Sequence, residues 1–249
     1  MDQIIGFIFI VFVIFLFSLP LILKEANKKS EVNENIDETS NVNDLKQEEL
    51  EPIKTEDING YFLTGHNEKL TFKKYTEVVL ELSNNSHIEN LNTFLGYIDE
   101  ESMTKYDKSA KKFNIISISF QIACFTYSTI LNANLDHKYI DAFMTKTITN
   151  ILDIKRDNER MYNEEDLPFF DFLVRKYISS IQQFLQDGGQ ILGHSPGDTM
   201  IEDLAESYNQ PVDSFCDMFN RNKLAEFQNL NIRSSIESVA SIGISWKSV

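Results

Sequence analysis

The pattern of hydrophobic and polar positions divides the chain into three parts. Residues Ile4 to Leu23 form a run of twenty residues without a charge. A helix of that length crosses a hydrocarbon core of about 30 Å. The residues that follow are strongly polar, and from about residue 60 hydrophobic side chains recur at helical spacing. We therefore expect a transmembrane anchor over 1–23, a linker over 24–59 and an α-helical domain over 60–249.

The amino-terminal run has a second interpretation, a cleaved secretory signal. Such signals have a basic start, an apolar run of roughly 7–15 residues and small residues at the cleavage site. This chain starts with an acid at Asp2, its run is longer, and charged residues follow at Lys24 and Glu25. The sequence thus favours an uncleaved single-pass signal anchor. Lys24, Lys28 and Lys29 follow the span, so the positive-inside tendency predicts that the carboxy-terminal domain faces the cytoplasm.

The linker is acidic. Residues 24–59 hold eleven Asp or Glu and five Lys, with few large apolar side chains. Such a segment buries too little apolar surface to offset its chain entropy, so we expect a flexible, solvated tether. A docking strip for a basic partner is the alternative interpretation.

The fold class predicted for residues 60–249 is mainly α, a bundle of about seven or eight helices. The apolar spacing and the Gly, Pro and Asp signals place these helices at 71–82, from 86, 100–131, 136–160, 168–187, 198–208, 212–227 and 232–249. Asn84-Asn85 is expected to end the first helix. Ser86 and Glu89 have the spacing of a capping box that begins the second.

The segment 113–135 is the most ambiguous. It has no charged residue and is long enough to cross a membrane. It also carries many Ser, Thr, Asn and Gln side chains, too many for a lipid-facing helix but acceptable in a helix surrounded by others. We predict a central buried helix, with a second span as the alternative. Ile116 to Phe120 also alternates as a β-strand would.

Charge and rare residues exclude several functional classes. The net charge of −15 argues against nucleic acid, whose phosphates bind clustered Lys and Arg. The four histidines fit no metal-ligand pattern, and no phosphate-binding or dinucleotide motif is present, so we predict no metal and no cofactor. Cys124 and Cys216 are expected to be buried thiols, with a single disulfide as the alternative in an oxidising compartment.

The segment Gly188 to Asp198 is the one candidate for catalysis. It holds four of the nine glycines and precedes a predicted helix capped by Asp198 or Thr199. Backbone amides in such a turn can face an anion, and His194, Ser195 and Asp198 are candidates for proton transfer. The simpler interpretation is a helix stop, a turn and a helix start. A second acidic group, Asp153, Asp157 and Glu164 to Asp166, is a weak candidate for a divalent cation.

A row of lysines marks a candidate membrane-surface or partner-binding face, namely Lys105, Lys108, Lys111 and Lys112. The alternative is a solvated face paired with neighbouring acids. Since catalytic motifs are missing, the leading hypothesis is a membrane-anchored interaction or adaptor domain with a protein partner. Two hypotheses compete with it, a membrane-tethered enzyme that uses the Gly188 to Asp198 segment and a secreted helical effector.

Overall fold

The computed structural model describes residues 58–249 except 96–99, 157, 189–194 and 209–220. All of these residues belong to one compact unit. The predicted anchor at Ile4 to Leu23 and residues 24–57 of the predicted linker lie outside the described residues.

The described region is mainly helical, as the spacing of apolar residues predicts. It contains α2 (Phe72–Leu95), α3 (Glu100–Ala133), α4 (His137–Thr149), α5 (Leu167–Gln186), α6 (Pro196–Ser207) and α8 (Arg221–Ile242). Two 3-10 turns, η3 (Asn150–Asp153) and η4 (Glu164–Asp166), flank the segment between α4 and α5. Five short strands complete the described elements: β1 (Gly60–Leu63), β2 (Lys69–Thr71), β3 (Lys155–Arg156), β4 (Glu159–Arg160) and β5 (Ser245–Ser248).

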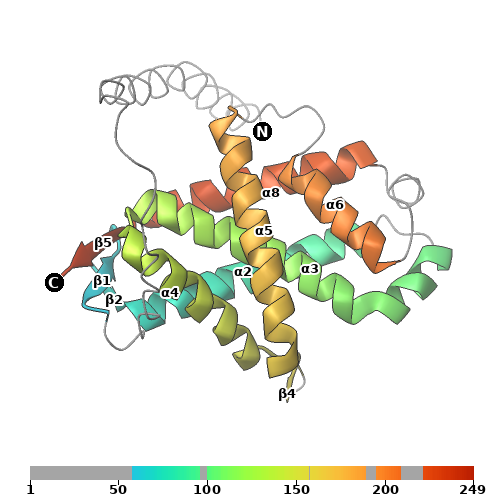
Figure 1. Cartoon of the computed structure of the whole chain (residues 1–249), viewed down its shortest axis with the longest axis horizontal. Coiled ribbons are helices and arrows are strands. Elements are labelled where there is room, and N and C mark those ends of the chain that lie inside the picture. Colours follow the sequence, from blue (N-terminus) through green and yellow to red (C-terminus); the bar gives the residue numbers. More distant parts are fainter. Residues whose placement is uncertain (1–57, 96–99, 157, 189–194, 209–220) are drawn as a thin grey trace, which may run out of the picture. The chain divides into compact units, whose positions relative to one another are not determined.

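Helix α3 is the centre of the unit, and α2, α5, α6 and α8 all pack against it. Figure 1 shows α5 crossing α3, with the small sheet beside the carboxyl terminus. Among the described residues, Ala110–Ala133 is the one helical segment long and apolar enough to cross a membrane, and 78% of its apolar stretch is buried. This burial favours a central helix over a second span, and the β-strand alternative for Ile116 to Phe120 is wrong.

Bonds within the helix satisfy some of the buried hydroxyls of α3. Ser128 Oγ donates to the Cys124 carbonyl at 2.6 Å, and Thr129 Oγ1 donates to the Phe125 carbonyl at 2.9 Å. A hydroxyl that bonds to the carbonyl four residues earlier needs no other partner when it is buried. Ser119 Oγ and Thr126 Oγ1 are buried in the same helix without a partner among the described residues, so its polar residues are only partly compensated.

The prediction of two helices over 71–95 is wrong, since α2 continues through Asn84 and Asn85. The polar residues that resemble a helix start instead bond across to α3. Ser86 Oγ donates to Gln121 Oε1 at 2.9 Å, and His87 Nδ1 lies 3.0 Å from Ser117 Oγ. Tertiary hydrogen bonds thus take the place of the predicted capping box.

The helix predicted over 136–160 begins as expected, since Asp136 accepts from the Lys138 amide. It ends at Thr149, eleven residues early, and η3 and the β3–β4 hairpin follow. Asn158 sits in the hairpin turn with φ 68°, a left-handed conformation that Asn tolerates better than most residues. The predicted helix was too long because apolar residues continue at helical spacing past the point where α4 ends.

The three-stranded sheet, with strand order β2-β1-β5, was not predicted. Residues 232–249 do not form a separate final helix, because α8 continues to Ile242 and β5 then pairs with β1. The start of the predicted 212–227 helix lies outside the described residues. Phe62 of β1 is fully buried and its ring lies 4.3 Å from Tyr75 and 4.9 Å from Trp246. This aromatic contact joins the sheet to α2.

Helix α5 matches its sequence signals at both ends. Asn163 and Asp166 form a capping box at η4, Pro168 lies in the first turn, and Gly188 follows the helix with φ 71°. Its buried residues contact the α3 core, where the rings of Phe120 and Tyr177 lie 5.4 Å apart.

Candidate functional site

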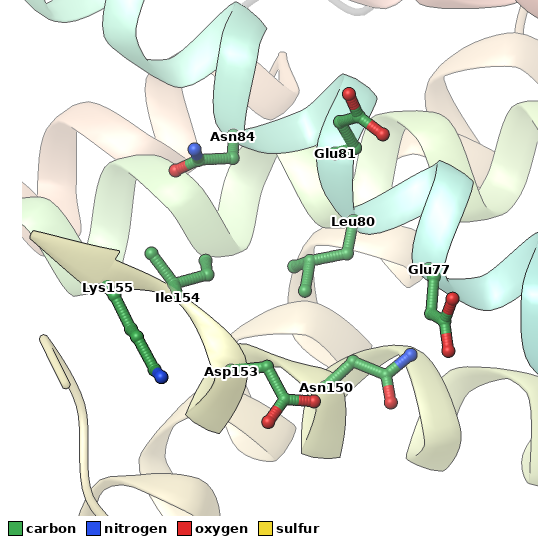
Figure 2. A pocket seen from close by; sticks show the side chains of 8 residues that line it. All are labelled: Glu77, Leu80, Glu81, Asn84, Asn150, Asp153, Ile154 and Lys155. Carbon is green, nitrogen blue, oxygen red and sulfur yellow. The ribbon is translucent and has the colours of Figure 1, made fainter. Parts of the chain in front are cut away.

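A groove of about 310 Å³ lies between α2 and the segment that follows α4. Glu77, Leu80, Glu81 and Asn84 form one wall because residues three or four apart share a helix face. Figure 2 shows Leu80 pointing toward the second wall, which belongs to η3 and β3, and the Glu81 carboxylate pointing away from it. That wall consists of Asn150, Asp153, Ile154 and Lys155. The early end of α4 therefore creates the groove.

The groove has an apolar floor and a charged rim. Leu80 is 8% exposed and Ile154 is half-buried, whereas Glu81, Asp153 and Lys155 are exposed. Carboxylates outnumber cations in the lining by three to one. The Lys74 Nζ lies 3.0 Å from Glu77 Oε2 and partly neutralises that carboxylate. The remaining negative charge comes from Glu81 and Asp153, on opposite walls.

Asn150 holds the two walls together. Its side chain is 5% exposed, and Nδ2 donates to Thr76 Oγ1 of α2 at 3.0 Å. Thr76 in turn donates to the Lys73 carbonyl at 2.7 Å. The amide oxygen Oδ1 of Asn150 has no hydrogen-bond partner within the described part of the chain. Asn150 thus joins the two walls of the groove through one hydrogen bond.

The predicted catalytic segment is only partly described, since His194 lies outside the described residues. Ser195 and Asp198 are brought together at the start of α6. The Asp198 amide donates to Ser195 Oγ at 3.2 Å, and the Ser195 amide and hydroxyl donate to Asp198 Oδ2 at 3.0 and 2.8 Å. Ser195 is therefore the cap of α6, three residues before the predicted position. Both side chains are used in starting the helix, as the simpler interpretation expects.

The lysine row is also only partly described. Lys105 and Lys108 lie in α3, in a stretch where the helix is described but the side chains are not. Lys112 is exposed, and Lys111 Nζ lies 2.9 Å from Asp166 Oδ1. Burial raises the pKa of Asp166, but the Asn163 amide and Lys111 outweigh it and hold that pKa below its ordinary value. Lys111 thus links α3 to the start of α5.

The acidic group proposed from the sequence as a cation site is only partly described. In the described ranges, no three His, Cys, Asp or Glu side chains lie close enough to hold a metal ion. Asp157 lies outside those ranges, Asp153 lines the groove, and Glu164 to Asp166 form η4.

Sequence reasoning missed the buried pair of His87 and Ser117. Each side chain is 4% exposed, and burial lowers the pKa of His87 to about 4. A histidine beside a serine hydroxyl resembles part of a nucleophilic pair. Because both side chains are enclosed between α2 and α3, the hydroxyl is closed to a substrate and the pair serves packing.

The groove residues were missed as well. Asn84 was interpreted as a helix break and Asn150 as the interior of a longer helix. One sequence signal could have identified them: Asn84 and Asn150 are polar residues at positions where the helical spacing of α2 and α4 predicts a buried side chain. No protein family, curated protein or solved structure matches this chain.

Proposed function

We propose that this protein is a single-pass membrane-anchored interaction domain that binds another protein through the groove. The anchor is the uncharged run Ile4 to Leu23, and the acidic segment after it separates the domain from the bilayer. The helical unit supplies a rigid binding surface. In this proposal the domain faces the cytoplasm, as Lys24, Lys28 and Lys29 favour.

The observation that carries the proposal is the groove with its apolar floor and exposed carboxylate rim. Protein interfaces commonly combine a buried apolar centre with a polar rim. The volume of about 310 Å³ is at the small end of the range of roughly 300–1,000 Å³ for small-molecule pockets. A groove of that size accommodates one or two side chains of a partner better than a whole cofactor.

The test is crosslinking and pull-down of the full-length protein from its native membrane, compared with a variant that begins near Glu56. We expect a specific partner to be held by both forms, because the groove lies entirely in the helical unit. Retention by the full-length form alone would place binding in the first 55 residues. Absence of a partner from both would contradict the proposal and favour the tethered-enzyme alternative at Gly188 to Asp198.

A further inference from the structure

We propose that the outer face of the β2-β1-β5 sheet docks on an anionic lipid surface, an inference that rests on the membrane anchor of the proposed function. Figure 1 shows the sheet at one end of the helical unit. The inner face of the sheet packs on the helices, since Phe62 and Trp246 belong to the aromatic core. The outer face is the one on the other side.

Alternation along the strands defines the outer face. Successive residues of a strand point to opposite sides of a sheet. Because Phe62 and Trp246 point toward the helices, the residues next to them in sequence point outward. Phe62 pairs with Leu70 and with Trp246, which carries the same alternation to β2 and β5. The outer face therefore consists of Tyr61, Leu63, Lys69, Thr71, Ser245 and Lys247.

The first argument is the chemistry of this face. Lys247 lies directly opposite Tyr61 on the neighbouring strand, and Lys69 Nζ lies 4.8 Å from the centre of the Tyr61 ring. Both lysines are exposed, and within the described part of the chain neither forms an ion pair. At a lipid surface a tyrosine ring sits at headgroup level, and lysine extends its ammonium to the phosphates. The outer face thus carries both residue types that such a surface attracts.

The second argument is the absence of acid from the sheet. None of the three strands contains Asp or Glu, although the chain holds 38 acidic residues and has a net charge of −15. The nearest acid in sequence, Glu68, lies in the turn between β1 and β2, where its amide donates to Thr64 Oγ1. An anionic surface repels the acidic remainder of the domain and attracts the two lysines. Charge therefore turns the outer face toward the lipid.

The third argument is the point at which the chain enters the domain. β1 is the first element of the described region, and in the proposed function residues 24–57 connect it to the anchor. A solvated chain of 34 residues spans about 30 Å on average. The tether therefore holds the sheet within reach of the bilayer. At such a high effective concentration, the weak attraction of two lysines is enough for docking.

The experiment uses the full chain in lipid nanodiscs and measures how close the outer face lies to the headgroups. The fluorescent group NBD is attached to the variant Ser245→Cys, and a nitroxide on the lipid headgroups quenches it at short range. Cys124 is buried and escapes labelling, and Cys216 is replaced by Ser. Gln182→Cys places the same probe at an exposed position of α5, a helix away from the sheet (Figure 1).

Lipid composition and salt test the role of charge. In discs with about one third phosphatidylserine, the nitroxide should quench the Ser245→Cys probe at least about threefold more than the Gln182→Cys probe. The difference should be lost in discs of phosphatidylcholine alone, which carry no net charge. It should also shrink at about 0.5 M NaCl, because salt screens the attraction between exposed charges.

Lysine variants locate the docking face. Each lysine near an anionic surface strengthens binding by about fivefold, so Lys69→Gln with Lys247→Gln should weaken docking by about 25-fold and remove the extra quenching. Lys112→Gln with Lys155→Gln is the matched control, since both lysines are exposed on other elements and the change in net charge is equal. The control should keep the quenching. Circular dichroism on each variant confirms that the helical fold is retained.

Three results would overturn the inference. They are equal quenching of the two probes in anionic discs, equal losses in the two double variants, and quenching that is undiminished in phosphatidylcholine discs. Co-elution of the chain with the discs separates this failure from failure of the proposed anchor. A chain that co-elutes but keeps an unquenched Ser245→Cys probe retains the anchor and contradicts only the docking of the sheet. A chain that does not co-elute contradicts both.

Discussion

At the scale of single residues, the polar side chains between α2 and α3 make stability depend on pH. His87 is 4% exposed and bonded to Ser117, and burial lowers its pKa from an ordinary 6.5 to about 4. The unfolded chain therefore binds a proton at a pH where the folded chain does not. The contribution of His87 to the free energy of unfolding is therefore fully present above about pH 6.5 and is lost as the pH decreases toward 4.

We expect the free energy of unfolding to fall by about 2 kcal/mol between about pH 7 and pH 5 because of His87 alone. Urea unfolding at both pH values measures it. His87→Gln removes the titrating ring, so the variant should lose that part of the pH dependence while carboxylate effects remain the same. A variant with the full wild-type pH dependence would show that His87 is not the group responsible.

Tyr177 offers a second residue-scale prediction. Its hydroxyl donates to Asp203 Oδ2 at 2.7 Å, and Lys176 Nζ lies 2.6 Å from Oδ1 of the same carboxylate. Burial, together with the charge and hydrogen bond of Asp203, raises the pKa of Tyr177 well above its ordinary value. The hydroxyl therefore stays protonated and joins α5 to α6.

Tyr177→Phe should lower the free energy of unfolding by about 1–2 kcal/mol, because it leaves a largely buried carboxylate oxygen without its donor. Chemical unfolding measures the loss. Tyr127→Phe is the control, since Tyr127 is half-buried and its hydroxyl has no hydrogen bond among the described residues. Equal effects of the two substitutions would contradict the assigned role of Asp203.

At the scale of elements, the sheet depends on close contact between β1 and the ring of Trp246. A Cβ atom added at Gly60 would overlap the Cζ2 and Cη2 atoms of that ring. The ring is itself confined, with centroids 4.9 Å from Phe62 and 5.5 Å from Tyr139. Gly60 is therefore required by space rather than by backbone conformation.

Gly60→Ala should lower the free energy of unfolding by about 1–3 kcal/mol, because the added methyl forces a packed ring to move. Trp246 is the only tryptophan in the chain, so its fluorescence reports the displacement directly. We expect a red shift of the emission as the ring becomes more exposed. Ser248→Ala, at the residue paired with Gly60 on β5, should change neither quantity. An unshifted emission in Gly60→Ala would show that the ring does not fill this space.

The elements also show which features a sequence can predict. The limits of α5 are marked by local chemistry, Asn163 and Pro168 at one end and Gly188 at the other, and these signals need no tertiary contact. The continuity of α2 depends on partners 30 and 35 residues away, Ser117 and Gln121, which the sequence pattern does not connect to His87 and Ser86. Long-range polar contacts therefore overrode the local signals of a break.

The candidate site also combines features that local sequence signals predict with features that depend on long-range contacts. The sequence analysis predicted a helix start in this segment from local signals but placed its cap at Asp198 or Thr199, three or four positions after the observed cap Ser195. The groove joins residues 77–84 to residues 150–155 through the Asn150 to Thr76 bond, a separation of 74 positions. Neither half of the lining marks a groove by itself in the sequence, because the two halves lie side by side only in the folded chain.

At the scale of the whole molecule, the uncharged run and the charge that follows it predict where the protein resides. Twenty apolar or uncharged residues contribute far more transfer free energy than reversible surface binding requires. The protein should therefore stay in the membrane pellet after alkaline carbonate washing and dissolve only with detergent. A variant lacking residues 4–23 should move to the soluble fraction.

The lysines after the span predict the orientation of the protein in the membrane, and the same membrane fraction can be used to test it. Protease added to sealed vesicles with the cytoplasmic face outward should digest the domain, because Lys24, Lys28 and Lys29 favour its placement on that face. Vesicles of the opposite orientation should protect it until detergent is added. Protection of the domain in the first preparation would show that it faces the opposite side of the membrane. Mass spectrometry of the purified protein tests the other alternative: a mass too low by the first residues would favour a cleaved leader and the secreted-effector hypothesis. A partner that reaches the groove must lie on the face of the membrane that this experiment identifies, because the groove belongs wholly to the domain after the span.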